Sequence, residues 1–160
     1  MLLFEDSKYI DLKLPDAAVH YYPKFLSSNE SECYFQSILS KTKWQHDDIT
    51  VFGKTYKQPR LTSFYSENTK TLNYSNISMK PNRFYSELLD IKNAVEQTIE
   101  HKFTSCLLNL YRDGSDSNGW HADDENELGV NPVIASVSFG AGRMFHLKHK
   151  NKPHKFKLLH

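Results

Sequence analysis

The chain has 160 residues, of which 39% are hydrophobic and 13% aromatic, and its formal net charge is +1. A chain of this length is expected to form one domain whose core needs no disulfide bonds. The near-zero net charge excludes recognition of nucleic acid or membrane through an overall polybasic character, so a charged partner must be recognised locally.

The first half of the chain predicts short strands around one helix. Aromatic and β-branched residues over Ala18–Leu26 predict a strand. Ser27 and Ser28 can cap a helix that ends near Trp44. The other elements expected here are a hairpin over Ile49–Lys57, turning at Gly53-Lys54, and a strand over Arg60–Tyr65.

The second half begins with a polar stretch, residues 66–80, which predicts a loop. Pro81 is expected to open a helix through about His101, because apolar residues then recur every three or four positions. The strands predicted after it are Thr104–Tyr111, Val133–Phe139, Arg143–Lys150 and Lys155–Leu159. Helices followed by short antiparallel strands predict an α+β fold, with helices packed on a sheet or jelly-roll.

Cysteine content and the N-terminal residues bear on the cellular compartment. The two cysteines, Cys33 and Cys106, are too few for a disulfide framework and are expected to be small core residues. Acids stand near the N-terminus where a signal peptide needs an apolar run, and no stretch approaches the roughly 18 apolar residues of a membrane span. We therefore expect a cytoplasmic or nuclear protein.

Charge is uneven in the C-terminal third. Six acids fall between Asp113 and Glu127, whereas no acid follows Leu128. The basic residues of that last part are Arg143, Lys148, Lys150, Lys152, Lys155 and Lys157. Two interpretations stay open: two solvated faces, or a metal-side acidic cluster beside a phosphate-facing basic ribbon.

His121 and Asp123 are candidate metal ligands. Residues two apart on a strand share a face, so an imidazole and a carboxylate can point at one divalent ion such as Fe(II). The same spacing occurs at His46 and Asp48, which we interpret as surface loop. Context distinguishes the first pair, because a strand carrying Asn109 and Tyr111 on one face leads into it.

The run N-L-Y-R-D-G from Asn109, H-A-D-D-E from His121 and P-V-I-A-S-V-S-F-G-A-G-R-M-F from Pro132 resembles the AlkB-type Fe(II)/2-oxoglutarate dioxygenases. It is similar in particular to the animal homologues that repair alkylated DNA. V-F-G-K from Val51 and Q-P-R from Gln58 resemble the nucleotide-recognition region of that family.

The resemblance implies a double-stranded β-helix (jelly-roll) core with N-terminal helices packed on it. It further implies one partial domain over 1–160, in which 1–103 is an N-terminal extension with the recognition region and 104–160 begins the jelly-roll. We expect the C-terminal strands and the third iron ligand to be absent, since none of the four later histidines matches the family's position for that ligand.

The resemblance also implies residue roles. His121 and Asp123 match two iron ligands, and Asn109 and Tyr111 match residues that bind 2-oxoglutarate. The expected substrate-binding residues are Val51, Phe52, Arg60, Tyr74, Asp124, Glu125, Arg143 and Lys148. Among them Val51 and Phe52 match an apolar finger that fills the gap left by a flipped base.

Each of these residues also has an ordinary structural interpretation. Asn109 and Tyr111 would be buried groups satisfied by backbone, and Phe52 a core residue of its hairpin. Tyr74 would be a loop tyrosine, Asp124 and Glu125 would cap a turn, and the late lysines would protect an edge strand.

The function that the resemblance implies is oxidative demethylation of alkylated bases in DNA, with Fe(II) as cofactor and 2-oxoglutarate and O2 as co-substrates. We expect the 160-residue chain itself, a monomer with no membrane partner, to be inactive. The alternatives are a catalytically silent nucleic-acid-binding remnant, or a dioxygenase of the same superfamily acting on RNA or protein.

Overall fold

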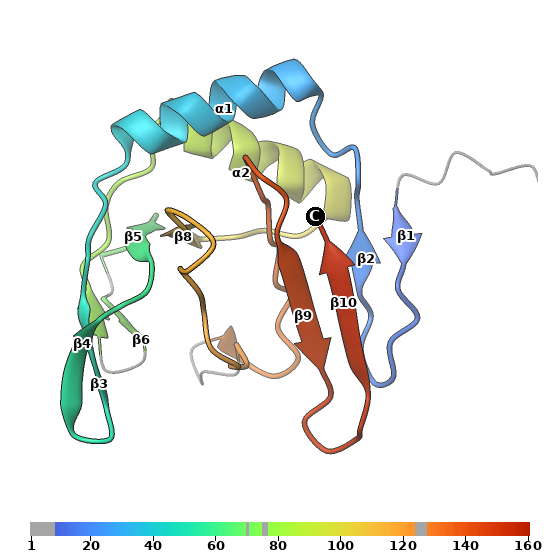
Figure 1. The fold of residues 1–160 in the computed structure, drawn as a ribbon. Helices are drawn as coiled ribbons and strands as arrows, with labels where there is room; N and C mark the ends of the chain where they lie inside the picture. Colours follow the sequence, from blue (N-terminus) through green and yellow to red (C-terminus); the bar gives the residue numbers. More distant parts are fainter. Residues whose placement is uncertain (1–8, 70, 75–76, 124–127) are drawn as a thin grey trace, which may run out of the picture. The chain divides into compact units, whose positions relative to one another are not determined.

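The computed structural model describes residues 9–69, 71–74, 77–123 and 128–160. The chain divides into two compact units, one formed by Met1–Gln36 with Val137–His160 and the other by Ser37–Ser136. Within the described residues the strands form five two-stranded antiparallel sheets (Figure 1). The α+β class is therefore confirmed, whereas the closed jelly-roll stays a prediction.

The first unit contains two short ladders. Strand β1 (Ile10–Asp11) pairs with β2 (His20–Tyr21), and β9 (Met144–Lys148) pairs with β10 (Lys155–Leu159). The predicted bounds of β10 are confirmed, and β9 is a shortened form of its prediction. The strand expected over Ala18–Leu26 shrinks to the two residues of β2.

No strand forms over Val133–Phe139, so that prediction is wrong. Val133 and Ile134 are exposed by 47% and 53%, and the stretch pairs with no strand in the described part of the chain. Alternating apolar residues favour a strand only where a neighbouring strand supplies hydrogen bonds and packing. Residues 133–139 therefore have the composition of a strand, but among the described residues no neighbouring strand pairs with them.

Helix α1 (Ser28–Lys41) begins with a reciprocal cap. The hydroxyl of Ser27 accepts a hydrogen bond from the Glu30 backbone N–H at 3.3 Å, and the Ser27 N–H donates to the Glu30 carboxylate at 3.0 Å. The predicted start of this helix is confirmed. Cys33 lies exposed on it, so its expected place in the core is wrong.

The second unit carries β3 (Asp48–Val51), β4 (Lys54–Lys57), β5 (Leu61–Ser66), β6 (Leu72–Tyr74), β7 (Ile77–Met79), α2 (Ser86–Ile99) and β8 (Ser105–Leu110). The loop predicted over 66–80 is wrong in part, because β6 and β7 pair within it. The stretch is rich in Asn, Ser and Thr, a composition typical of loops. The apolar side chain that fixes the hairpin is Met79, which is buried.

Strand β5 is the centre of the second unit. One face carries Phe64, which clusters with Met79 and with the partly buried Leu107 of β8. The other carries Tyr65, which is 2% exposed and lies against the rings of Phe84 and Tyr85. Cys106 of β8 is partly buried, and burial raises the pKa of its thiol to about 11. Both faces of this strand are thus covered.

Helix α2 begins at Ser86, later than Pro81 predicts. Asn82 explains the delay, because its N–H donates to Phe64 O at 2.8 Å and its carbonyl accepts from Ser66 N at 3.1 Å. These bonds hold the chain extended alongside β5. The helix ends at Ile99, and Glu100 follows in the left-handed region with φ 53°. None of the described helices is long and apolar enough to cross a bilayer.

A buried carboxylate fixes the chain where α2 ends. Glu96 is 4% exposed and accepts hydrogen bonds from Lys102 Nζ at 2.6 Å and Phe103 N at 2.8 Å, and it pairs with Lys92 Nζ at 2.8 Å. The bonds from Lys102 and Lys92 lower the pKa of Glu96 from 4.5 to about 2. The carboxylate therefore directs the chain from the helix toward β8.

We predict that Glu96→Gln lowers the urea midpoint at neutral pH. Because folding lowers this pKa, the carboxylate stabilises the fold above pH 4.5, and that contribution is lost as the pH falls toward 2. Urea unfolding at several pH values should show the gap between wild type and variant closing over this range. The matched control is Glu100→Gln, an exposed carboxylate at the end of the same helix. A gap that persists at pH 2 would contradict the assignment.

Two adjacent leucines on α2 test the packing of the helix. Leu88 is 4% exposed and Leu89 is 37% exposed. Leu88→Ala leaves a cavity and should lower the free energy of unfolding by about 2–5 kcal/mol, whereas Leu89→Ala should change it by less than about 1 kcal/mol. Chemical denaturation measures both values. Equal losses would mean that the helix packs through a different face.

Candidate functional site

Antiparallel pairing of β5 and β8 positions the first candidate residues. Leu110 is opposite Leu61, and Asn109 is opposite Thr62, at the point where β8 ends. Tyr111 follows one residue beyond the end of this strand, so the face that it shares with Asn109 stays a prediction. Asn109 is exposed and Tyr111 is half-buried, so the interpretation of Asn109 as a buried core group is wrong.

The loop after β8 is closed by an ion pair between the exposed Arg112 and the buried carboxylate of Asp116. Arg112 Nε and Nη2 donate to the two carboxylate oxygens of Asp116 at 2.8 Å each, and the Arg112 backbone N–H donates at 2.9 Å. Asp116 is 4% exposed, and Arg112 holds the pKa of its carboxyl well below the usual range. Asp113 accepts from Ser115 N at 2.8 Å in a local turn. These two acids therefore organise the loop itself.

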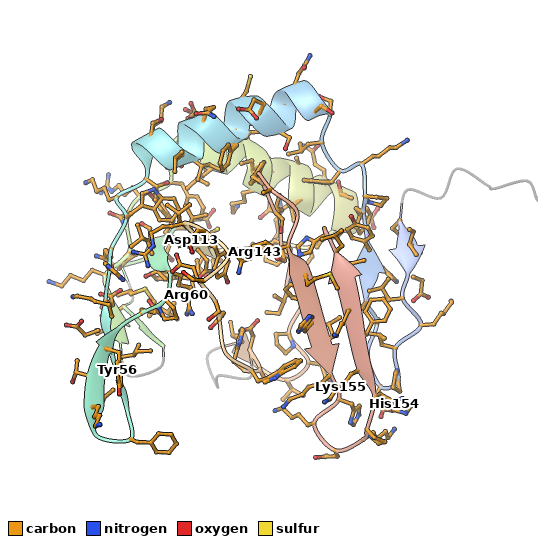
Figure 2. The ribbon with its side chains drawn as sticks, in the orientation of Figure 1. Tyr56, Arg60, Asp113, Arg143, His154 and Lys155 are labelled. Carbon is orange, nitrogen blue, oxygen red and sulfur yellow. The ribbon has the colours of Figure 1, made fainter. Side chains whose placement is uncertain are left out.

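Arg60 joins the loop to the segment before β5. It is 4% exposed, and its Nη1 donates to Asn118 Oδ1 at 2.6 Å. The adjacent Ser117 N donates to Pro59 O at 2.8 Å. Arg60 and Asp113 are labelled in Figure 2 in the part of the unit that holds β5 and β8. The side chain expected to contact substrate is thus buried and directed at the loop.

His121 follows this loop, and its tautomer is fixed by geometry. Its Nδ1 lies 2.8 Å from the carbonyl oxygen of Gly119. Because a carbonyl only accepts, Nδ1 carries the proton, and in the neutral imidazole Nε2 then carries the lone pair. Nε2 lies 3.8 Å from Asp123 Oδ1, and both side chains are about 40% exposed. His121 and Asp123 lie in a loop and not on a strand, so the strand geometry expected for this pair is not the reason why the two side chains lie close together.

The donor pair fits a small divalent metal. A first-row ion such as zinc binds nitrogen and oxygen at about 2.1 Å, so one ion can contact atoms up to about 4.2 Å apart. The 3.8 Å separation of His121 Nε2 and Asp123 Oδ1 falls within that limit. Among the described residues no group of three or more His, Cys, Asp or Glu side chains is arranged to hold an ion.

The second His-x-Asp pair does not converge. His46 Nε2 lies 2.8 Å from the carbonyl of Gln58, and Asp48 pairs with Lys57 at 2.9 Å. His46 is half-buried and Asp48 begins β3, so the interpretation of this pair as surface loop is wrong in part. Identical spacing therefore gives two different arrangements, decided by the hydrogen-bond partner of each imidazole.

The β3–β4 hairpin presents an aromatic tip. Its two turn residues are Phe52 with φ 48° and Gly53 with φ 75°, the signature of a type I′ turn, one residue earlier than predicted. Phe52 is fully exposed, so its interpretation as a hairpin core residue is wrong. Val51 ends β3 and Tyr74 ends β6, hence Tyr74 is not in a loop.

An open groove of about 540 Å³ lies along the same hairpin. It is lined by Ile49, Phe52, Lys54, Tyr56, Lys57 and Pro59. Tyr56, labelled in Figure 2, is 52% exposed on β4 and was missed by sequence reasoning. Its position directly opposite Ile49 was the available signal, because cross-strand partners lie on one face.

The remaining candidates belong to the first unit or lie outside the described residues. Arg143 N donates to His160 O at 2.9 Å, just before β9. Lys148 is exposed opposite Lys155, which is labelled in Figure 2 at the start of β10. By register Lys157 lies on this face too, giving a hairpin face with three lysines. Asp124 and Glu125 lie outside the described residues.

The family described as the 2OG-Fe(II) oxygenase superfamily matches residues 18–160. The chain is 42% identical over 132 residues to alpha-ketoglutarate-dependent dioxygenase alkB homolog 3 of Bos taurus, covering 82% of this chain and 46% of that protein. For the human protein of that name the values are 41% over 133 residues, with 82% and 46% covered.

DNA oxidative demethylase ALKBH2 of Arabidopsis thaliana is 37% identical over 136 residues, covering 81% of this chain and 43% of that protein. The chain thus spans less than half the length of these relatives. The family match extends over nearly the whole sequence and includes the loop that carries His121 and Asp123. The chain belongs to the 2OG-Fe(II) oxygenase superfamily, as an AlkB-type member.

Proposed function

We propose that this chain carries the His-x-Asp part of the iron site of a dioxygenase that removes methyl groups from alkylated bases in DNA. The observation that carries the proposal is the convergence of His121 Nε2 and Asp123 in a chain of this superfamily. The names of the relatives support the substrate, since one of them is a DNA oxidative demethylase.

Two pairs of side chains would serve the cofactor and the co-substrate. His121 and Asp123 would hold Fe(II), and the amide of Asn109 and the hydroxyl of Tyr111 would hydrogen-bond 2-oxoglutarate. The chemistry that Fe(II), O2 and 2-oxoglutarate supply is hydroxylation of an N-methyl group, with release of succinate and CO2. The hydroxymethyl product then loses formaldehyde and restores the base.

The hairpin tip gives the chain a means to open a duplex. Extruding a base costs a few kcal/mol, and methyl damage on the pairing edge lowers that cost. The exposed ring of Phe52 would fill the space left in the stack, with Val51 beside it. Tyr74, Asp124 and Glu125 would contact the extruded base, and Arg143 and Lys148 would contact phosphates.

The division of the chain into an N-terminal extension, 1–103, and the start of the jelly-roll, 104–160, stays a prediction.

The protein expressed from its complete coding sequence should release formaldehyde from DNA containing 1-methyladenine or 3-methylcytosine, in the presence of Fe(II) and 2-oxoglutarate. Asp123→Ala removes a ligand carboxylate and should reduce turnover to background. The matched control is Asp48→Ala, the aspartate of the other His-x-Asp pair, which should keep wild-type turnover because it pairs with Lys57 on β3–β4. Turnover on methylated RNA or peptide but not on DNA would overturn the substrate assignment.

Phe52→Ala should separate duplex from single-stranded substrate. Stacking of an aromatic ring on a base stabilises a complex by about 1–3 kcal/mol, so we expect about a tenfold loss of kcat/KM on duplex DNA. Single-stranded DNA needs no wedge and should lose much less. Thr55→Ala on the same hairpin is the control, and thermal unfolding should be unchanged because the ring is fully exposed. Equal losses on both substrates would contradict a wedge.

A further inference from the structure

We propose that Arg60, Asp116 and Asn118 are positioning residues that fix the His121 imidazole in its Nδ1–H tautomer by holding the Gly119 carbonyl in place. They act through the backbone of residues 116–119, which ends two residues before the candidate ligand. Only the link from this tautomer to a metal rests on the proposed function.

Each residue of this run has its own contact. The Asp116 carboxylate receives the Arg112 guanidinium and the Arg112 N–H. Ser117 N donates to Pro59 O at 2.8 Å, and Asn118 Oδ1 accepts from Arg60 Nη1 at 2.6 Å. The Gly119 carbonyl then accepts from His121 Nδ1 at 2.8 Å. The hydrogen bond to His121 is therefore made by the Gly119 carbonyl, and each of the three residues before Gly119 has a contact that fixes its position.

The composition of this loop makes such contacts necessary. The segment between Arg112 and His121 contains Gly114, Gly119 and two serines, and ordering residues of this kind costs about 1–2 kcal/mol each in backbone entropy. Regular secondary structure contributes nothing here, because no helix or strand covers residues 111–123. The order of the loop comes instead from contacts such as its ion pair, the Asp113 turn and the two contacts with the segment before β5.

The burial of Arg60 supports a role inside the protein. Its guanidinium is shielded, and its Nε is buried without a hydrogen-bond partner. At 4% exposure the side chain has little surface with which to contact solvent or phosphate. The contact that Arg60 makes is with Asn118, three residues before His121. Arg60 thus sets the loop, rather than reading the nucleic acid.

The tautomer matters because a metal takes the ring nitrogen that lacks a proton. With Nδ1–H bonded to the Gly119 carbonyl, the lone pair of Nε2 faces Asp123. If the carbonyl moves, the imidazole loses this acceptor for Nδ1–H and can carry its proton on Nε2 instead. The pair would then present a donor to Asp123 and could not share an ion.

Nitrogen-15 NMR of the metal-free protein tests the inference, because neutral imidazole shifts distinguish the two tautomers. Spectra are recorded above the ordinary histidine pKa of about 6.5, with His121→Gln identifying the signal. The wild type should show Nδ1–H at His121. Asn118→Ala and Asp116→Asn should each shift the signal toward a mixture of tautomers, whereas Asn118→Asp retains the acceptor for Arg60 and should restore the wild-type signal. Asp90→Asn, which changes an exposed carboxylate of α2 outside the loop, is the matched control.

A second readout is Mn(II) binding followed by electron paramagnetic resonance. Loss of an outer contact typically weakens metal binding 10–100-fold, so Asn118→Ala should weaken it by that factor and Asn118→Asp should not. An unchanged tautomer in both Asn118→Ala and Asp116→Asn would overturn the inference, and so would global unfolding of both, which would make the contacts a stability element. A tautomer shift in a protein that binds no Mn(II) and shows no turnover would uphold the positioning and reject the proposed function.

Discussion

The antiparallel register of β5 and β8 is the constraint on which the site depends. Because Leu61 is opposite Leu110, the segment that enters β5 and the loop that leaves β8 meet at one end of the ladder. Arg60 can therefore reach Asn118 across 58 positions of sequence. A one-residue slip of β8 would turn Leu107 away from the cluster of Phe64 and Met79, so the same packing that forms the core also fixes the position of the loop.

Sequence patterns predicted those elements whose stability is local. The Ser27–Glu30 cap, the apolar stripe of α2 and the turn signal of the β3–β4 hairpin depend on neighbours a few residues away. Composition also located β5 and β8 within a residue of their observed bounds, although these paired strands are distant in sequence. The patterns failed at two other stretches where distant partners decide. Polar residues conceal the β6–β7 hairpin, which needs Met79 in the core, and Val133–Phe139 has strand composition without a neighbouring strand.

The candidate site shows the same division. The His-x-Asp spacing identifies His121 and Asp123 as candidate metal ligands, but His46 and Asp48 have the same spacing. The difference lies in whether each imidazole meets the carbonyl of Gly119 or that of Gln58, and no local pattern contains that information. Arg60 was assigned to nucleotide recognition because the resemblance places it there, whereas its burial depends on the loop that folds over it.

The backbone at the hairpin tip carries a consequence for any attempt to make this protein more robust. A non-glycine residue in the left-handed region is strained by about 1–2 kcal/mol, and Phe52 occupies it at φ 48°. Asparagine tolerates this conformation far better, and Asn-Gly is the preferred pair for such a turn. Optimising the chain for stability alone would therefore select asparagine here and delete the ring, so thermal tolerance and the proposed wedge role of the ring are in direct competition at one residue.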